Sequence, residues 1–264
     1  ADKICNGATD NASGCALVLE VARALIQAGA TPRRSLLFAF WDAEEDGLLG
    51  STHYAQKMNL DKVVASLNVD TVGSEIIPGD SSSFALGAEY ASGLRELVHK
   101  NSAHLGFKTH PVSSYFVGDG KGGRSDHYPF RVKQIPVLFF SSGVTAEYHT
   151  PADEVALVKW DKLLNTTRHV LLTTADVANA GAKPSFVAAP KPSLDDGRAL
   201  VSLGAVVLKN PAALGITDQN LLSLLKTLLA KVQGYLDDPP DTQQEWDSYE
   251  SLIKSIITMV FSYL

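Results

Sequence analysis

The chain has 264 residues, 45% of them hydrophobic and 20% charged, so it is long enough for a closed core and too apolar for a disordered chain. The formal net charge is −6 and the nearest approach to a basic cluster is Arg33-Arg34, which argues against a nucleic-acid-binding protein. No apolar run approaches the roughly 20 residues that a membrane span needs, so the sequence predicts no membrane span.

Helix and strand patterns alternate along the first two thirds of the chain. Apolar residues at helical spacing predict a helix from Ala12 to Ala28, capped by Asp10 and Asn11 and ended by Gly29. The continuous apolar run Ser35 to Trp41 predicts a strand buried on both faces. This alternation predicts an α/β layer fold with a mostly parallel sheet covered on both sides. The remaining predicted elements are helix 49–57, strand 63–69, strand 83–86, helix 91–105, strand 134–143 and helix 159–178.

The character of the chain changes near Gly181. Residues 1–182 form the predicted main domain, and the proline-containing stretch 183–198 is predicted to be a linker. Residues 199–264 are predicted to form a helical appendage with two apolar helical stripes, 221–235 and 246–263. We interpret these as helices that dock on the main domain, or that contact a partner subunit or a second copy of the chain.

Two cysteines, Cys5 and Cys15, lie ten residues apart and could pair. Because Cys15 falls on a predicted helix, we interpret it instead as a small apolar residue. The first residues show no charged-then-apolar signal pattern, which leaves the compartment open.

Several polar residues follow the predicted strands at the points where ligands bind in parallel α/β sheets. Glu44 and Glu45 follow the strand that ends at Trp41, and two more carboxylates lie beside them, at positions 42 and 46. Asp70 follows the next strand, His149 follows the strand that ends near Phe140, and Asp10 opens the first helix. Carboxylate oxygens with one imidazole suit zinc or a similar divalent ion, and such an ion would offset the desolvation of the crowded carboxylates.

Each of these residues also has an ordinary structural interpretation. Asp10 could be a helix cap, and Glu44-Glu45 a solvated helix start. Asp70 could be a turn residue. In the sequence HTPAD, Thr150 could cap a helix with Asp153 completing the arrangement. Their shared position at the strand ends of one sheet favours the metal-binding interpretation over these alternatives.

Six sequence blocks, read together, resemble the co-catalytic zinc aminopeptidases of peptidase family 28. The blocks occur in the order GATDNASG, AEEDGLLGS, NVDTVG, SDHYPF, IPVLFF and YHTPAD, and they span residues 7–153. The resemblance implies a three-layer α/β/α sandwich with a mixed, mostly parallel sheet. It also implies hydrolysis of the N-terminal residue of peptides with a free N-terminus, and it favours a secreted or periplasmic protein.

The resemblance also implies roles for individual residues. Asp10 matches the carboxylate that bridges two zinc ions, Glu45 and His149 match ligands of one ion, and Asp70 matches a ligand of the other. Glu44 matches the general base. Tyr148 matches a tyrosine that donates a hydrogen bond to the tetrahedral intermediate, and its alternative is a packing role. Two further residues of SDHYPF fit the family block without an assigned role, Asp126 and His127. The glycine-containing loop 112–124 is expected to help build the substrate pocket.

The sequence departs from the family in one ligand. The family's fifth ligand is a histidine in a His-x-Asp motif upstream of GATDNASG, and none of the nine residues before Asp10 is a histidine. We expect a longer protein that supplies this segment; the alternatives are another chain that supplies it or a true lack of the ligand. With the ligand we expect two zinc ions, and without it one, held by Asp10, Glu45 and His149. A single-zinc enzyme resembling glutaminyl cyclases and a non-catalytic scaffold are the alternative functions.

Overall fold

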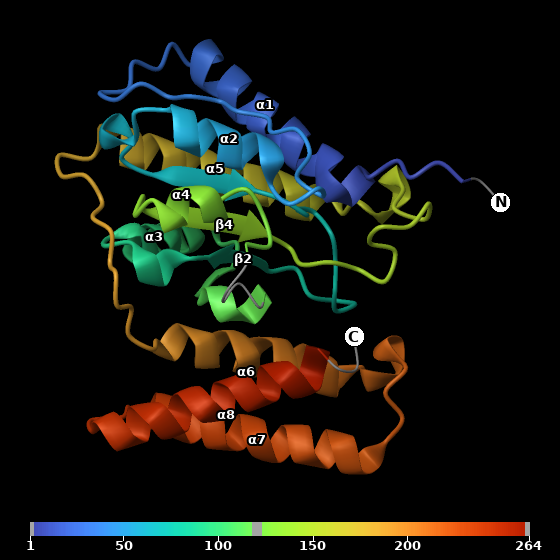
Figure 1. Ribbon diagram of the computed structural model, residues 1–264. Coiled ribbons are helices and arrows are strands. Elements are labelled where there is room, and N and C mark those ends of the chain that lie inside the picture. The colour runs from blue at the N-terminus through green and yellow to red at the C-terminus, as the bar shows by residue number, and fades with distance from the viewer. Residues whose placement is uncertain (1–2, 118–122, 262–264) are drawn as a thin grey trace. The chain divides into compact units, whose positions relative to one another are not determined.

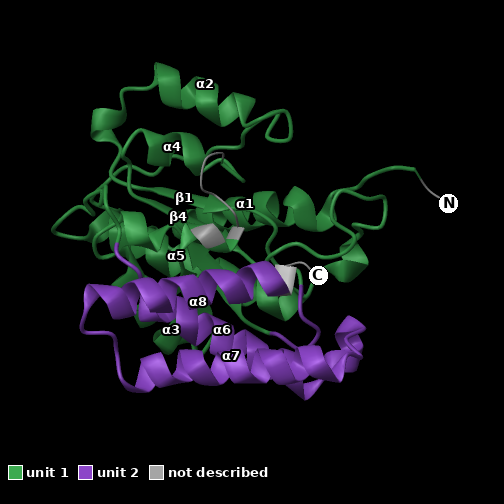
Figure 2. Ribbon diagram, turned by 60° about the horizontal axis from the view of Figure 1, so that its bottom comes forward, with its two compact units in different colours: residues 1–74, 81–190 green, residues 75–80, 191–264 purple. Residues whose placement is uncertain are grey.

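A computed structural model describes residues 3–117 and 123–261 of the chain (Figure 1). The loop 112–124, expected at the substrate pocket, falls partly outside these residues. The chain separates into two compact units, residues 1–74 with 81–190 and residues 75–80 with 191–264 (Figure 2). The predicted appendage thus falls in the second unit. Among the described helices, none combines the length and the low polarity that crossing a lipid bilayer requires.

A four-stranded sheet forms the centre of the first unit. The strands lie in the order β1 (Ser66–Val69), β4 (Val137–Ser141), β2 (Ser83–Leu86) and β3 (Thr109–Val112). β1 pairs parallel with β4 and β2 pairs parallel with β3, while β2 and β4 are antiparallel. This confirms the predicted mixed, mostly parallel sheet.

Helices cover both faces of this sheet, as Figure 2 shows for α2 and α4 on one side and α5 on the other. Strand β4 is buried throughout, and its side chains alternate between two cores. Leu138 and Phe140 pack with α1, α3 and α5, whereas Val137 packs with α2 and α4. The predicted three-layer α/β/α sandwich is therefore confirmed. The helices are α1 (Ser13–Gln27), α2 (Leu49–Lys57), α3 (Leu94–Leu105), α4 (Tyr128–Val132) and α5 (Trp160–Asn179).

The predicted strand from Ser35 to Trp41 is wrong. This segment is extended but forms no strand, and three of its apolar side chains are exposed: Leu37 by 65%, Phe38 by 37% and Phe40 by 49%. An apolar run becomes a strand only when a neighbouring backbone pairs with it, and none of the described strands pairs with this segment. Because the segment from Ser35 to Trp41 is not part of the sheet, the prediction that both of its faces are buried is also wrong.

Helix 49–57 and strand 83–86 have the predicted bounds, and helix 159–178 is shifted by one residue. Helices 12–28 and 91–105 and strands 63–69 and 134–143 are present with shorter bounds. Strand β3, helix α4 and helix α6 (Leu194–Lys209) were not predicted. α6 begins inside the stretch 183–198, where Ser193 caps it by accepting a hydrogen bond from the Asp195 amide at 3.1 Å. The remaining short turns are a π-helical turn, Ala8–Ala12, and 3₁₀ turns at Leu60–Lys62, Ala88–Tyr90, Ser114–Val117, Val155–Leu157 and Pro211–Leu214.

The second unit is built from α6 and the two helices that the apolar stripes predict, α7 (Gln219–Asp237) and α8 (Gln243–Phe261). Tyr263, the last residue of the second stripe, lies outside the described residues. Gly204 lets α6 approach α7 closely, because a Cβ atom there would lie 2.2 Å from Leu229 Cδ1. Tyr249 of α8 is fully buried and accepts a hydrogen bond from the Gly197 amide at 2.9 Å.

Candidate metal centre

The parallel pairing of β1 and β4 brings their carboxyl ends to the same edge of the sheet. Asp70 follows β1 directly, and its amide donates to the Phe140 carbonyl at 3.1 Å. The hydroxyl of Thr71, two residues beyond β1, and that of Ser141, the last residue of β4, lie 2.7 Å apart and are hydrogen-bonded. These bonds fix Asp70 relative to the loop after β4, which carries His149.

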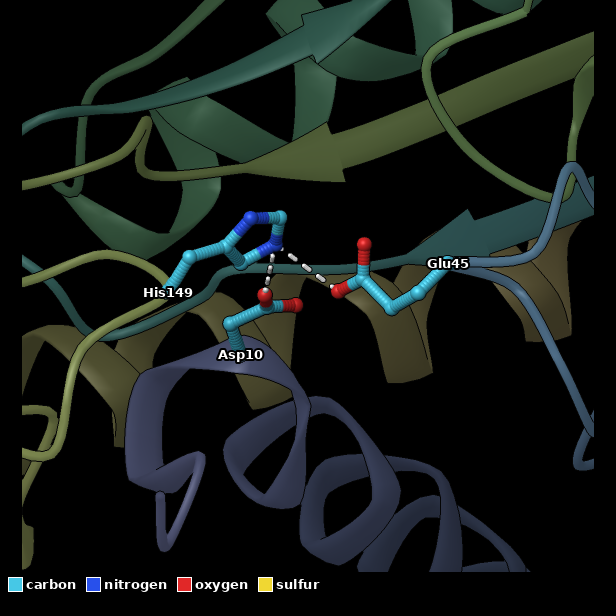
Figure 3. A group of neighbouring side chains, drawn as sticks. All are labelled: Asp10, Glu45 and His149. Atoms are coloured by element: carbon cyan, nitrogen blue, oxygen red, sulfur yellow. Dashed lines mark hydrogen bonds and ion pairs between the residues drawn. The ribbon is translucent and has the colours of Figure 1, made fainter. Parts of the chain in front are cut away.

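Asp10 at the start of the first helical segment, Glu45 and His149 converge from three separate parts of the chain, as Figure 3 shows. The Nε2 atom of His149 lies 2.8 Å from Glu45 Oε1 and 3.2 Å from Asp10 Oδ2. One ligand atom from each residue lies within 4.8 Å of the other two, which is close enough for a single cation to contact all three. The structure therefore brings together the three residues that the sequence analysis placed at one ion.

The Asp10 side chain is 12% exposed and does not cap α1. The neighbouring Asn11 caps the start of the helix instead, because its Oδ1 accepts a hydrogen bond from the Gly14 amide at 3.1 Å. Its Nδ2 donates to the Val69 carbonyl at 3.0 Å, which ties the start of α1 to the end of β1. Asn11 thereby frees the Asp10 carboxylate to face His149.

Backbone strain is concentrated at this edge of the sheet. Three non-glycine residues in the left-handed region lie at or beside predicted site residues: Ala43 (φ 54°), Thr71 (φ 50°) and His149 itself (φ 58°). Such conformations are disfavoured for residues with a Cβ atom and cluster at functional sites. They are consistent with loops held for ligand binding rather than for local stability.

Burial and repulsion from neighbouring carboxylates raise the pKa values of Asp10 and Glu44. Desolvation is the largest cause for Asp10, whose pKa rises to about 7, with repulsion from Asp70 and Glu45 adding to it and attraction to His149 opposing it. Desolvation also leads for Glu44, whose pKa rises to about 8 with further repulsion from Asp70, Glu45, Asp126 and Asp10. The site therefore gathers several acidic groups around one imidazole, and their ionisation is costly without a positive charge between them.

Asp70 lies near this cluster, because its charge acts on both Asp10 and Glu44. It is 8% exposed, and its Oδ2 accepts a short hydrogen bond, 2.6 Å, from the Ser125 hydroxyl, which in turn accepts from Asn68 Nδ2 at 2.7 Å. Its Oδ1 is buried and has no hydrogen-bond partner among the described residues. Burial raises the pKa of Asp70, although the Ser125 hydrogen bond works against the rise.

These observations fit a bound divalent cation. A buried carboxylate oxygen without a hydrogen-bond partner is costly, and carboxylates at this spacing repel one another, unless positive charge lies between them. Oxygen ligands with one imidazole are a donor set that zinc accepts. The residues present therefore fit the metal that the sequence analysis expected.

The remaining predicted residues lie nearby or in the core. The Tyr148 ring stacks on the His149 imidazole, with centroids 3.7 Å apart, and desolvation together with the nearby carboxylates raises the pKa of its hydroxyl. His127 is fully buried and stacks on Phe139, which is a core position. Burial raises the pKa of Asp126, and its Oδ1 is buried without a hydrogen-bond partner among the described residues. Both cysteines are exposed and unpaired.

Two residues of the site were missed by reasoning from the sequence. Ser125 holds Asp70 and is the first residue of the block SDHYPF, of which only the second and third residues were singled out. Asp153 was read as part of a helix cap, yet its carboxylate accepts hydrogen bonds from Thr9 and Asp10. Ser125 and Asp153 both lie in the sequence blocks that resemble the family, and this position could have identified them as residues of the site.

Comparisons with known proteins find relatives with peptidase-related names and solved structures of similar fold. The leupeptin-inactivating enzyme 1 of Streptomyces exfoliatus is 35% identical over 164 residues, which cover 60% of this chain and 34% of that protein. The aminopeptidase from Aneurinibacillus sp. strain AM-1 superposes with a TM-score of 0.57 at 28% identity, covering 72% of this chain and 44% of that one. BSAP, a zinc aminopeptidase from Bacillus subtilis, superposes with a TM-score of 0.57 at 27% identity, covering 69% of this chain and 46% of that one.

The chain spans less than half the length of each of these relatives. A family model also matches about two thirds of the chain. The model of peptidase family M28 matches residues 1–174, the range that contains every residue of the candidate metal centre. On this match, and on the fold and ligand geometry that accompany it, the chain belongs to peptidase family M28.

Proposed function

We propose that this chain is a zinc-dependent aminopeptidase that hydrolyses the N-terminal residue of peptides. The observation that carries the proposal is the convergence of Asp10, Glu45 and His149, with Glu44 adjacent in sequence to one of them. Membership of the family and the aminopeptidase names of its relatives support it. Asp10, Glu45 and His149 would hold one ion, and Asp70 would provide a ligand for a second.

The chain's own residues suit this reaction. Zinc, when bound, would polarise the scissile carbonyl and lower the pKa of the attacking water. Glu44 would take the proton of that water and deliver it to the leaving amine, and a bound cation would offset the neighbouring carboxylates and keep Glu44 ionised for this step. The raised pKa of Tyr148 keeps its phenol protonated, so that it can donate a hydrogen bond to the developing oxyanion.

The acidic character of the site suits the exopeptidase specificity. Repulsion among Asp10, Glu44 and Asp70 would be relieved by a positive group as well as by the metal. A protonated amino terminus of a peptide is such a group, whereas a blocked amino terminus is not. We therefore propose that the free amino group of the substrate is recognised at this edge of the sheet.

We propose further that the chain by itself holds one zinc ion. Among the described residues, Asp10, Glu45 and His149 are the one group of three histidine, cysteine or acidic side chains close enough to share an ion. A second ion would need a ligand beyond Asp70 and the bridging Asp10. We also propose that residues 1–182 carry the catalytic function and that 183–198 join it to a helical appendage over 199–264.

The test combines metal analysis with three substrates. The purified full chain, loaded with Zn²⁺ and desalted, is assayed with leucine p-nitroanilide, its N-acetylated form and a peptide that begins with glutamine. We expect bound zinc and release of leucine from the free substrate alone. Bound zinc with pyroglutamate as the one product would favour a cyclase, and neither zinc nor product would favour a scaffold; either result would overturn the proposal.

A further inference from the structure

The loop that carries Asp10 and the loop that carries His149 are joined by one buried carboxylate, that of Asp153. Its Oδ1 accepts hydrogen bonds from the Thr9 amide at 2.9 Å and from the Thr9 hydroxyl at 2.8 Å. Its Oδ2 accepts from the Asp10 amide at 3.0 Å and from the Thr9 amide at 3.1 Å. Residues 144 positions apart in the chain are thus held at hydrogen-bond distance.

Both sides of this contact are shielded from water. Asp153 is 2% exposed and Thr9 is 3% exposed. A buried carboxylate is stable only when donors surround it, and the two amides and the hydroxyl supply them. Thr9 and Asp10 lie in an irregular turn with non-helical backbone angles at Asp10. Their amides donate to the Asp153 oxygens. Loss of the carboxylate would leave these donors without an acceptor.

Two further contacts join the same segments. The Ala8 amide donates to the Asp153 carbonyl at 3.2 Å, and Asn6 Nδ2 donates to Glu154 Oε1 at 2.8 Å. The backbone at Asp10 is therefore attached to the segment four residues beyond His149. The alternative interpretation of Asp153 as part of a helix cap does not hold, because its carboxylate accepts from Thr9 and Asp10. Thr150 Oγ1 accepts from the Ala152 amide at 3.2 Å.

We propose that Asp153 is a positioning residue that sets the separation of Asp10 and His149 before a metal ion arrives. This inference rests on the proposed function, because it assigns a purpose to the distance between two proposed zinc ligands. Asp153 contacts the Asp10 backbone rather than the reacting atoms. It acts by holding the Asp10 amide, and hence its side chain, opposite the His149 imidazole at 3.2 Å.

The primary test is Asp153→Asn, which keeps the size of the side chain but replaces one acceptor oxygen with an amide that faces an N–H donor. Zinc affinity is measured by competition with a chromogenic chelator, and amide hydrogen exchange of Thr9 and Asp10 is measured in the metal-free protein. We expect zinc affinity to fall 10- to 100-fold, as is typical when a partner of a metal ligand is changed, and exchange at both amides to accelerate.

The matched control is Asn101→Ala. Asn101 is 2% exposed in the same unit and donates to Thr173 Oγ1 and Asp176 Oδ2, between α3 and α5. Its loss should lower thermal stability while zinc affinity stays within twofold of the wild type. A merely structural role for Asp153 predicts the same pattern in both variants, so unchanged zinc affinity in folded Asp153→Asn overturns the proposal.

A second variant decides the matter if Asp153→Asn fails to fold. Thr9→Val removes one donor to Asp153 and keeps both amides, and we expect a several-fold loss of zinc affinity; an affinity equal to the wild type overturns the proposal. If the wild type binds zinc but releases no amino acid, the proposed function fails while this inference is still tested. If the wild type takes up no zinc, unchanged exchange at Thr9 and Asp10 in Asp153→Asn overturns the positioning role.

Discussion

His149 Nε2 lies 2.8 Å from Glu45 Oε1, although 104 residues separate the two in the chain. Glu45 belongs to the loop between the extended segment 35–41 and α2, and His149 to the loop after β4. Both side chains are about half exposed, at 58% and 48%. An exposed polar contact of this kind contributes little stability, so the convergence supports the proposal that the two side chains share a metal ion.

The first prediction concerns His149→Ala, which removes one of three protein ligands from the proposed ion. We expect zinc affinity to fall by more than the 10- to 100-fold that is typical of changes to a ligand's hydrogen-bond partner, because the donor atom itself is lost. The measurement is zinc content after dialysis against a chelator of known affinity. His104→Ala on the exposed surface of α3 serves as the control and should bind zinc as the wild type does. Equal zinc retention in both variants would reject the ligand assignment.

The second prediction concerns Glu44→Gln, which keeps the shape of the side chain and removes its basicity. Turnover of leucine p-nitroanilide should drop by about 100- to 10,000-fold, the range that general-base removal produces. Zinc content should not change, since Glu44 is outside the group of three ligands. Turnover within a few fold of the wild type would show that another group accepts the proton.

The third prediction concerns the pH dependence of stability through His169. This residue is fully buried in α5, its Nδ1 lies 2.9 Å from the Thr109 hydroxyl, and its Nε2 has no hydrogen-bond partner among the described residues. Burial lowers its pKa to about 4, whereas a histidine in an unfolded chain has a pKa of about 6.5. At a pH between these two pKa values, His169 is protonated in the unfolded chain and neutral in the folded one. The free energy of unfolding therefore falls as the pH drops through this range, by at most about 3 kcal/mol.

The variant that tests this is His169→Asn, which retains a side-chain N–H and loses the titration. The free energy of unfolding is measured with urea at pH 7 and at pH 5 for both proteins. The wild type should lose more stability than the variant over this interval. Equal losses in the two proteins would show that His169 does not contribute to acid sensitivity.

The fourth prediction concerns Tyr249→Phe in the second unit. The Tyr249 hydroxyl donates to the Ser193 carbonyl at 2.9 Å and accepts from the Gly197 amide at 2.9 Å, which attaches α8 to the first turn of α6. Removing it leaves a buried amide without that acceptor, so we expect a loss of about 1–3 kcal/mol in the free energy of unfolding.

The control for this prediction is Tyr235→Phe, which deletes the hydroxyl of the neighbouring ring, 5.5 Å away between centroids. Its unfolding free energy should stay within about 0.5 kcal/mol of the wild type, as is usual for changes away from such contacts. Guanidinium unfolding followed by helical circular dichroism measures both. Equal stability of the two variants would contradict the proposed part of Tyr249.

The local pattern of the sequence determined those helices and buried strands whose apolar residues follow a regular spacing or a continuous run. The apolar spacing of α1, α5, α7 and α8 predicts helices wherever they pack, and β4 is apolar on both faces because it lies between two helical layers. The predicted strands also placed Asp70 after β1 and His149 in the loop after β4, whereas the strand predicted before Glu44 and Glu45 does not form. These are properties of short stretches, which residue identity alone encodes.

Only the tertiary structure decided which segments pair and which side chains meet. The run Ser35 to Trp41 has strand composition but finds no strand partner among the described residues, while Thr109 to Val112, which has little strand signal, pairs with β2. Asp153 carries a capping pattern, and its carboxylate instead holds the Asp10 loop. Pairing and buried hydrogen bonds join residues far apart in the chain, so their free energy depends on the packed arrangement and is invisible in any single stretch of sequence.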